Sequence, residues 1–344
     1  MELAQARKAR ITPRLGGRIL ADALVAQGID HVFSVPGESF LDTLDGLYDV
    51  RQKLKLVTCR FEAGAVNMAE AYGKLTGRPA AAMVTRGPGA CHGAIGVHIA
   101  MQDSTPLLLF VGQIPHEDAG RDAFQEIDYR RMFGSVAKWV TQIDQTKRIP
   151  EIVAHAVDVA TSGRPGPVVI ALSEEMQRET AEVVDLARVL VTPAHPDPAA
   201  LVALRAMLGR ARKPLAVLGG SCWSAAGRSA IRDFLLANDI PVATGFRRQA
   251  LYDGTLDNFA GDLGVGSDPA LIGKVKEADL ILAIGSRLGD AVTQGYTLLD
   301  MAGSVPIVQV HPDGAEIGRV FRPAVGIVSD LNAFALAAAA IEPV

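Results

Sequence analysis

The sequence from Ala80 to His92, AAAMVTRGPGACH, joins a short apolar run to a glycine-rich turn and the start of a helix. The run Ala80–Thr85 has the length and composition of a buried strand, and Gly87-Pro88-Gly89 predicts a tight turn into the helix. A buried strand that leads directly into a helix is the unit from which parallel sheets are built. This stretch therefore predicts an α/β fold.

The same strand–turn–helix order recurs through the N-terminal half. Thr12 is expected to cap a first helix that has Pro13 in its first turn and Leu15 on its buried face. Another helix is predicted from Glu62 to about Thr76, where Gly77 ends it. Further strands are predicted at His31–Val35, Leu54–Thr58, Pro106–Val111 and Val168–Leu172.

A proline-rich connector, TPAHPDP (192–198), precedes a second series of strands and helices. The strands of this series are predicted at Pro214–Leu218, Ile240–Ala243, Leu280–Ile284 and Pro306–Val310. The chain is therefore expected to form two doubly wound parallel-sheet domains, residues 1–178 and 199–344, joined by a linker at 179–198.

Composition narrows the class of protein. Of 344 residues, 49% are hydrophobic and 21% charged, which supports full hydrophobic cores. The formal net charge of −4 argues against nucleic acid or an anionic membrane as a partner. No apolar stretch reaches the roughly 18 residues of a membrane span, and the first residues lack the apolar core of a signal peptide. The 3 cysteines are widely spaced, which fits a reducing compartment, so a cytoplasmic protein is expected.

Three turns that follow predicted strands are the candidates for a ligand site: Val35–Glu38, Arg60–Gly64 and Arg86–His92. In a parallel sheet such turns lie at one edge, where glycines let a ligand approach the backbone and helix N-termini favour acceptor groups. Each turn alone is more often a simple strand-to-helix connection. Together they predict a small-molecule site, while the P-loop, HExxH and GxSxG motifs are absent from the sequence.

The motifs of the N-terminal half follow the order and spacing of a known family. They are RFEAGAVNMAEAYG (60–73), TGRP (76–79), GPGA (87–90), QDSTP (102–106), AFQE (123–126) and SGRPGP (162–167). This half resembles the pyrimidine-binding domain of thiamine-diphosphate enzymes, in particular the acetolactate synthase large-subunit family and relatives such as benzoylformate decarboxylase. AIGSRL (283–288) and HPDGAEIG (311–318) extend the resemblance to the Rossmann-like central domain of that family, so that it covers nearly the whole chain.

The resemblance implies thiamine diphosphate as cofactor and a 2-oxo acid as substrate, for decarboxylation, carbon–carbon bond formation or both. Glu62 matches the catalytic glutamate that hydrogen-bonds N1′ of the aminopyrimidine, where proton sharing favours the imino form that produces the reactive ylid. Other residues match the family's cofactor site, namely Pro36, Gly37, Pro88, Gly89 and His92, and its substrate pocket, namely Glu38, Gln113, Phe124 and Gln125.

The sequence departs from the family pattern at Glu38, where acetolactate synthases have a second glycine, and at Cys91-His92, where they have Thr-Asn. A histidine there can transfer protons or hold a substrate carboxylate, as histidines do in related decarboxylases, or it can pack beside the cofactor at a helix start. In the second domain, Arg287 is the candidate for a nucleotide contact. The sequence around Arg287 follows the flavin-bearing pattern only in part, which leaves FAD open.

Family members carry a third domain that binds the diphosphate through Mg²⁺, marked by Gly-Asp-Gly, and no Gly-Asp-Gly occurs in this sequence. The resemblance therefore implies that the chain holds no metal ligand and that the Mg²⁺ ligands come from a missing C-terminal domain. The chain is then expected to be a fragment, the product of a truncated gene, or a subunit whose partner supplies that domain. The resemblance also implies a homo-oligomer that completes each site across two subunits.

Two other functions remain compatible with the sequence. The chain can be a non-catalytic two-domain remnant or a regulatory module that binds a nucleotide in its second half. An NAD-dependent oxidoreductase fits the strand–helix pattern, but Gly219-Gly220-Ser221 lacks the GxGxxG spacing of a dinucleotide site, which ranks this function last.

Overall fold

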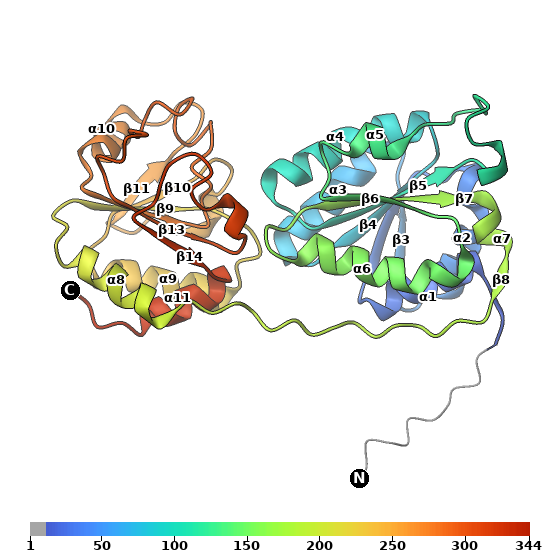
Figure 1. The fold of residues 1–344 in the computed structure, drawn as a ribbon, viewed down its shortest axis with the longest axis horizontal. Coiled ribbons are helices and arrows are strands. Elements are labelled where there is room, and N and C mark those ends of the chain that lie inside the picture. Colours follow the sequence, from blue (N-terminus) through green and yellow to red (C-terminus); the bar gives the residue numbers. More distant parts are fainter. Residues whose placement is uncertain (1–11) are drawn as a thin grey trace, which may run out of the picture. The chain divides into compact units, whose positions relative to one another are not determined.

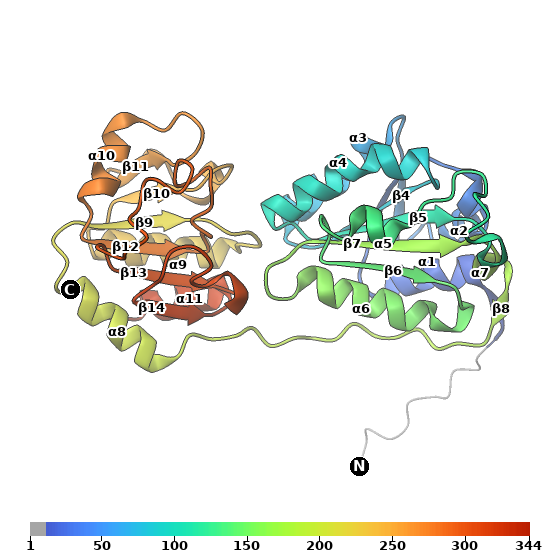
Figure 2. The same ribbon diagram turned by 45° about the horizontal axis from the view of Figure 1, so that its top comes forward.

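The computed structural model describes residues 12–344, which divide after Leu190 into two compact parts, here called unit 1 and unit 2. Each unit contains one parallel six-stranded sheet with helices on both faces (Figures 1 and 2). The predicted α/β class with two doubly wound parallel sheets is therefore confirmed.

Unit 1 is built around a sheet of strand order β3-β2-β4-β5-β7-β6. The chain leaves the first strand, β2, toward β3 on one side and then returns toward β4 on the other, so the loops after β2 and β4 flank a switch point in the winding. The strands and helices of unit 1 are β1 (Arg14–Leu15), α1 (Gly16–Ala26), β2 (His31–Ser34), α2 (Leu41–Asp49), β3 (Lys55–Thr58), α3 (Glu62–Thr76), β4 (Ala80–Val84), α4 (Pro88–Asp103), β5 (Leu107–Gln113), α5 (Tyr129–Phe133), β6 (Trp139–Ile143), α6 (Ile149–Thr161), β7 (Pro167–Ser173), α7 (Glu174–Arg178) and β8 (Thr180–Ala181).

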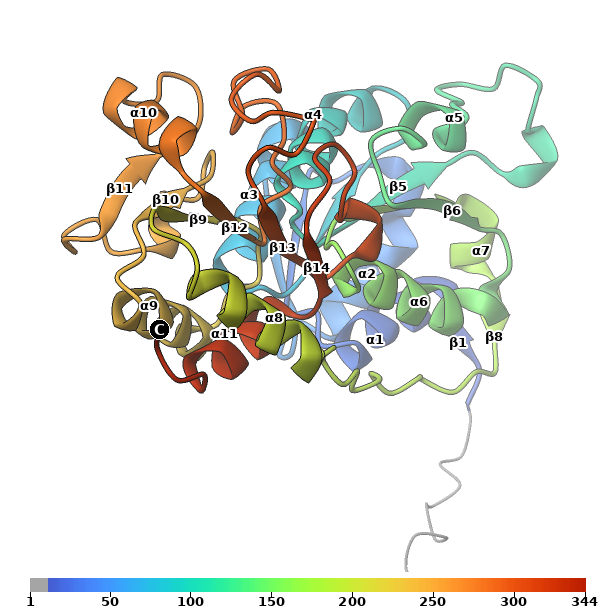
Figure 3. The ribbon, with the colours of Figure 1, turned by 60° about the vertical axis from the view of Figure 1, so that its left-hand side comes forward.

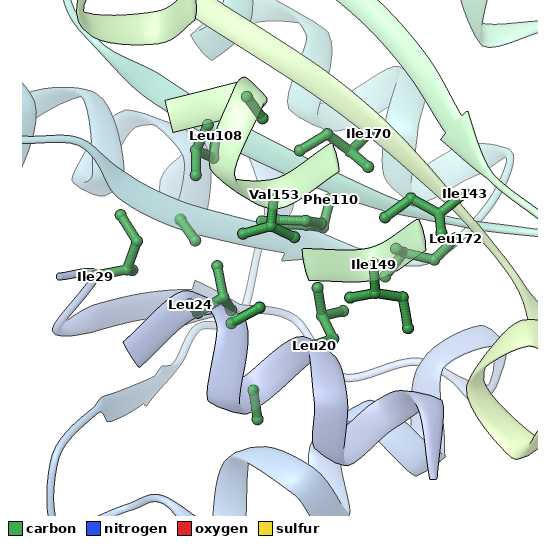
Figure 4. Packing of buried hydrophobic residues seen from close by; sticks show 14 of the residues in the cluster. Leu20, Leu24, Ile29, Leu108, Phe110, Ile143, Ile149, Val153, Ile170 and Leu172 are labelled. Atoms are coloured by element: carbon green, nitrogen blue, oxygen red, sulfur yellow. The ribbon is translucent and has the colours of Figure 1, made fainter. Parts of the chain in front are cut away.

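The central strands of unit 1 are buried on both faces, which is why they read as continuous apolar runs. In β4, Ala81 and Met83 pack against the face covered by α1 and α6, while Ala82 and Val84 pack against the face covered by α3 and α4. Figure 4 shows the first of these cores, in which side chains of α1 and α6 meet β5 and β7. Burial on both faces fixes the sheet between two helical layers and leaves its strand ends to form a site.

The start of the first helix differs from the prediction. Thr12 and Pro13 precede the short strand β1, which pairs antiparallel with β8, and α1 begins only at Gly16. Leu15 is 47% exposed and adopts an extended backbone, so Thr12 is not the helix cap and Leu15 is not part of the core. The pairing with a strand far along the chain overrides the local Thr-Pro signal for a helix start.

Unit 2 has the strand order β11-β10-β9-β12-β13-β14, in which winding starts at β9 and changes direction between β9 and β12. Helices α8, α9 and α11 pack on one face of this sheet, and α10 lies on the other (Figure 3). The strands and helices of unit 2 are α8 (Pro198–Leu208), β9 (Pro214–Leu218), α9 (Ala225–Ala237), β10 (Val242–Thr244), β11 (Phe259–Asp262), α10 (Pro269–Glu277), β12 (Leu280–Ile284), β13 (Ile307–His311), β14 (Val325–Val328) and α11 (Leu331–Ala339).

A surface cluster around Asp30 makes the stability of unit 1 sensitive to acid. Burial alone would raise the pKa of Asp30, but hydrogen bonds from His31, Tyr72 and Arg78 outweigh it and lower the pKa from 3.8 to about 2. A carboxyl group whose pKa is lower in the folded state stabilises the fold above its unfolded pKa, and this contribution is lost as the pH falls through the folded pKa.

Asp30→Asn is therefore expected to be less stable than the natural chain at pH 6, with the difference shrinking between about pH 4 and pH 2. Urea unfolding at pH 6, 4, 3 and 2 checks this, with Asp45→Asn, at an exposed position, as the control. An unchanged difference across that pH range would contradict the role of Asp30.

Candidate functional site

The loops that the sequence singled out meet at the carboxyl edge of the unit 1 sheet. Strands β2, β3, β4 and β5 are parallel and in register. Their ends lead into Pro36-Gly37, into Glu62 at the start of α3, into Gly87-Pro88-Gly89 and out of Gln113. The switch point between β2 and β4 therefore lies between two glycine-containing loops, with Glu62 beside them.

Glu62 is the first residue of α3 and contacts His92 of α4. Its Oε2 lies 3.0 Å from Nδ1 of His92, and the His92 ring packs against Phe61 with 5.2 Å between ring centroids. The side chain of Glu62 is only 14% exposed, whereas that of His92 is 55% exposed. The helix N-terminus favours the negative charge of Glu62, and His92 adds a neighbour that can donate to the carboxylate.

Two glycines bring the backbone of these loops close to their neighbours. A Cβ atom at Gly37 would lie 2.5 Å from Cβ of Thr85 at the end of β4, so no larger residue fits without a shift. A Cβ atom at Gly89 would lie 2.9 Å from Cγ2 of Thr85 and 3.7 Å from Oε1 of Glu62. The loop after β2 is tied to β4 by a 3.0 Å hydrogen bond between the hydroxyls of Ser39 and Thr85.

Pro36, Glu38 and Pro88, which the resemblance placed in the cofactor site and substrate pocket, are exposed at this edge. Glu38 begins a short 3-10 helix, Glu38–Phe40, whose Phe40 is buried in the core. The edge therefore presents an exposed carboxylate at Glu38 and a mostly buried one at Glu62.

Tyr129 joins two of the loops, and the sequence did not single it out. Its hydroxyl accepts a 3.0 Å hydrogen bond from the amide of Gly87 and donates one of 3.2 Å to the carbonyl of Gly112. Burial raises the pKa of Tyr129 to about 12, so the phenol stays protonated and can donate at ordinary pH. The aromatic side chain thereby fixes the Gly87 turn against the end of β5.

Tyr129→Phe is expected to lower the free energy of unfolding by about 1–3 kcal/mol, because it leaves the amide of Gly87 and the carbonyl of Gly112 buried without this partner. Urea unfolding measures the change. Tyr48→Phe, at a side chain that is 64% exposed, serves as the control and should leave stability nearly unchanged. Equal stabilities for the two variants would contradict the role given to the Tyr129 hydroxyl.

The loop that connects β5 to α5 carries two of the predicted substrate residues. Gln113 is 6% exposed, and its side chain bridges the two ends of this loop, donating to the carbonyl of Ile127 at 2.9 Å and accepting from the amide of Ile114 at 3.0 Å. Gln113 thus holds the base of the loop. Gln125 packs on the Gly87 turn, where a Cβ atom at Gly87 would lie 2.7 Å from Cβ of Gln125, while Phe124 is 75% exposed.

A pair of glutamates at the start of α7, which sequence reasoning also missed, reaches this edge. Glu174 forms an ion pair with Arg86, the residue before the glycine turn, and Glu175 contacts His116 in the loop after β5. The pairs join residues 88 and 59 positions apart in the chain. A Glu-Glu sequence at a helix start is an ordinary dipole signal, so only the fold shows these contacts.

Arg287 lies at the corresponding edge of unit 2, in the loop after β12. Gly285 in this loop has a positive φ of 73°, and a Cβ atom there would lie 2.6 Å from the carbonyl oxygen of Gly219, after β9. The loops on both sides of the unit 2 switch point are therefore in backbone contact, and Arg287 is half-buried next to them.

Glu62 offers the kind of group that an aminopyrimidine ring requires. Within residues 12–344, Oε2 of Glu62 is engaged by His92 while Oε1 has no hydrogen-bond partner, and it lies close to Gly89, where no side chain intervenes. A mostly buried carboxylate with one open oxygen beside a glycine fits a ring nitrogen that shares a proton.

Two features were searched for in the part of the chain that the structure describes and were not found there. No group of three or more His, Cys, Asp or Glu side chains is arranged to hold a metal ion. No helix is both long enough and apolar enough to cross a membrane.

Comparison with known proteins identifies both units. Residues 14–132 match the family described as "Thiamine pyrophosphate enzyme, N-terminal TPP binding domain", and residues 201–338 match "Thiamine pyrophosphate enzyme, central domain". The chain belongs to the thiamine pyrophosphate enzyme family and contains its N-terminal and central domains.

Within that family, similar proteins include acetolactate synthases. Acetolactate synthase isozyme 2 large subunit of Escherichia coli (strain K12) is 31% identical over 318 residues, or 92% of this chain and 57% of that protein. The chloroplastic acetolactate synthase of Arabidopsis thaliana is 30% identical over 93% of this chain and 48% of its own length, and the large subunit of Lactococcus lactis is 30% identical over 93% and 56%. The chain thus spans about half the length of these relatives.

Proposed function

We propose that this chain provides the pyrimidine-binding and central domains of an acetolactate synthase-like enzyme that acts on 2-oxo acids. The single observation that carries the proposal is the position of Glu62: a carboxylate that is 14% exposed, at the first turn of α3, beside the Gly87–Gly89 turn. Glu62 is the catalytic residue in this proposal.

Residues of the carboxyl edge would hold the cofactor by direct contact. Pro36, Gly37, Pro88 and Gly89 offer backbone without bulky side chains, and Oε1 of Glu62 would share a proton with the ring nitrogen N1′ of the aminopyrimidine. Thiamine diphosphate, when bound, supplies a nucleophilic carbon that adds to the keto group of a 2-oxo acid and accepts the electrons released on decarboxylation. The shared proton would lie on the Oε1 side of Glu62, because Oε2 is already engaged by His92.

The substrate would lie against the residues that border this edge. Glu38 and Phe124 are exposed there, and Gln125 packs on the Gly87 turn. Gln113 contributes by holding the base of the loop that carries Phe124 and Gln125, since both ends of its amide are engaged by the backbone.

His92 is proposed to move a proton to or from Glu62 or to hold the substrate carboxylate. Its Nδ1 is already 3.0 Å from Oε2 of Glu62, and its side chain is 55% exposed. His92→Ala is expected to reduce kcat by about 100-fold, at the lower end of what a positioned acid or base contributes. Steady-state kinetics of the complete enzyme check this, and turnover equal to that of an exposed control, His98→Ala, would retire the role.

The remaining parts of the enzyme are proposed from the length of its relatives, of which this chain spans about half. A further domain, on this polypeptide or on a separate subunit, would bind Mg²⁺ and the diphosphate. The active site would then be completed in a homo-oligomer or in a complex with such a subunit. The reaction is assigned to carbon–carbon bond formation, decarboxylation or both, as a transferase or lyase.

A second function, nucleotide binding in unit 2, is favoured by one observation. The unit 2 sheet has the order of a dinucleotide-binding fold, with Gly219 and Gly285 in contact at its switch point and Arg287 beside them. The proposed ligand at the switch point of unit 2 is FAD or an adenine nucleotide. The chain would bind it either as part of a catalytic enzyme or as a binding module without catalytic activity.

The proposal is tested on the complete product of the natural gene. We expect calorimetric titration with thiamine diphosphate and Mg²⁺ to show saturable binding, and a panel of 2-oxo acids to give CO₂ release that depends on the cofactor. Titration with FAD and ADP is the parallel measurement. A folded protein that binds FAD or ADP but neither binds thiamine diphosphate nor releases CO₂ would overturn the enzymatic proposal in favour of the binding module.

A further inference from the structure

The loop from Ile114 to Asp128 is held at its base and near its C-terminal end. A third contact holds the part of the loop between these two places. Gln113 bridges the base, and Gln125 packs on Gly87 near the C-terminal end of the loop. Within the loop, Oε1 of Glu126 accepts from the amide of Gly120 at 2.7 Å and Oε2 from the amide of Ala123 at 3.1 Å, which gives this stretch its own shape. The third contact joins the short 3-10 helix His116–Asp118 to α7.

Glu175 makes this third contact through a single oxygen. Its Oε1 accepts from the backbone amide of His116 at 2.8 Å and also contacts Nδ1 of the His116 ring. Its Oε2 is buried and, among the described residues, has no hydrogen-bond partner. A carboxylate with one buried and unsatisfied oxygen depends strongly on the cation beside it, because burial penalises its charge.

His116 is the only titratable partner on the loop side of this contact among the described residues, and it faces acidic groups. Hydrogen bonding and charge from Glu175 raise the pKa of His116 above 6.5, and the charges of Asp144 and Glu117 raise it further. A histidine whose pKa is raised in the folded state is charged and pairs with its partner below pH 6.5. The stabilisation that this pair provides is lost as the pH rises through the pKa of the folded state.

The contact partners differ in how they respond to pH. Glu174, the neighbour of Glu175, is paired with Arg86 of the glycine turn, and an arginine keeps its charge throughout the accessible range. The glycine turn is therefore held by a pair whose cation keeps its charge, whereas the loop that faces it is held by a histidine whose charge depends on pH.

We propose that Glu175 is a positioning residue for the Ile114–Asp128 loop, and that protonated His116 closes this loop onto α7 while neutral His116 loosens it. Closure sets Phe124 and Gln125 beside the Gly87 turn. The contact between Glu175 and His116 is here called the latch. The effect of the latch on the substrate site rests on the proposed function, whereas the latch itself does not. The latch makes substrate access to the site dependent on pH.

Hydrogen exchange of the loop amides in this chain, without cofactor or substrate, tests the latch. His116→Asn keeps an N–H donor near the Nδ1 position but removes the charge, and its exchange rates are divided by those of the natural chain at the same pH, which cancels intrinsic exchange. At pH 6.0 we expect this ratio to be about 2 to 5 for residues 115–128, as for loss of an exposed ion pair. At pH 9.0 it should approach 1, and Glu175→Gln should reproduce the pH 6.0 result.

The control is His98→Asn, at an exposed position of α4, for which the ratio should be 1 at both pH values. A ratio for His116→Asn that is the same at pH 6.0 and pH 9.0, or equal to that of the control, would overturn the latch. Since no cofactor is present, failure of thiamine diphosphate to bind would leave this measurement unaffected, so the two proposals fail separately.

Discussion

Replacing Glu62 by glutamine is expected to lower kcat of the complete enzyme by at least about 100-fold, within the range that a positioned acid or base supplies. The substitution keeps the size of the side chain and its ability to hydrogen-bond His92, but an amide cannot share a proton with a ring nitrogen. The loss should appear in kcat, because the steps that depend on proton sharing follow cofactor binding.

The fold should survive this change. Glu62 is the first residue of α3, where loss of its charge at the helix N-terminus costs about 0.3–1 kcal/mol. Steady-state kinetics at saturating thiamine diphosphate, together with urea unfolding, separate the two effects. Glu182→Gln, at an exposed position that follows β8, is the control, and a Glu62→Gln enzyme whose kcat lies within twofold of that control would refute the catalytic assignment.

A large loss of stability is expected from Gly46→Ala, although alanine is the better helix former by about 1 kcal/mol. Helices α1 and α2 cross so closely that a Cβ atom at Gly46 would lie 2.4 Å from the carbonyl oxygen of Gly17, and one at Gly17 would lie 2.1 Å from that of Asp42. Both obstacles are backbone atoms, so the two helices have to move apart. We expect a net loss of about 3 kcal/mol in the free energy of unfolding, at the upper end of overpacked cores.

Gly64→Ala is the matched comparison for this measurement. Gly64 is also inside a helix of unit 1, but no atom lies within 4 Å of a Cβ placed there. Alanine at this position should therefore raise stability by up to about 1 kcal/mol. Urea unfolding of both variants decides the matter: if both changes have the same sign, the close crossing of α1 and α2 does not limit the residue at position 46.

The central strands of both sheets were predictable because burial on two faces leaves a continuous apolar run in the sequence. The bounds of β9 and β12 coincide with the predicted ranges. Three strands at the edges of the six-stranded sheets, β6, β11 and β14, were missed, as were β1 and β8 of the two-stranded sheet. An edge strand has one neighbour and a half-exposed face, so β6 mixes polar and apolar residues, and β11 and β14 each contain a glycine that weakens the strand pattern.

The location of the candidate site was also predictable in outline. Parallel strands place their following turns at one edge, which brings Gly37, Glu62 and Gly89 together without any knowledge of their contacts. The contacts themselves, such as Glu62 with His92, Tyr129 with Gly87 and Glu175 with His116, were not predictable from the pattern. They join residues 30 or more positions apart, and no periodicity in the sequence specifies such pairs.

The antiparallel pairing of β1 with β8 has a consequence for how this protein can be divided. The strand that enters unit 1 lies next to the strand that leaves it, and Arg14 reinforces the junction through a 2.9 Å ion pair with Asp185. Both polypeptide connections of the unit therefore emerge at one place, so the module can be transplanted, or permuted by joining its old ends and opening new ones, without threading chain through its core.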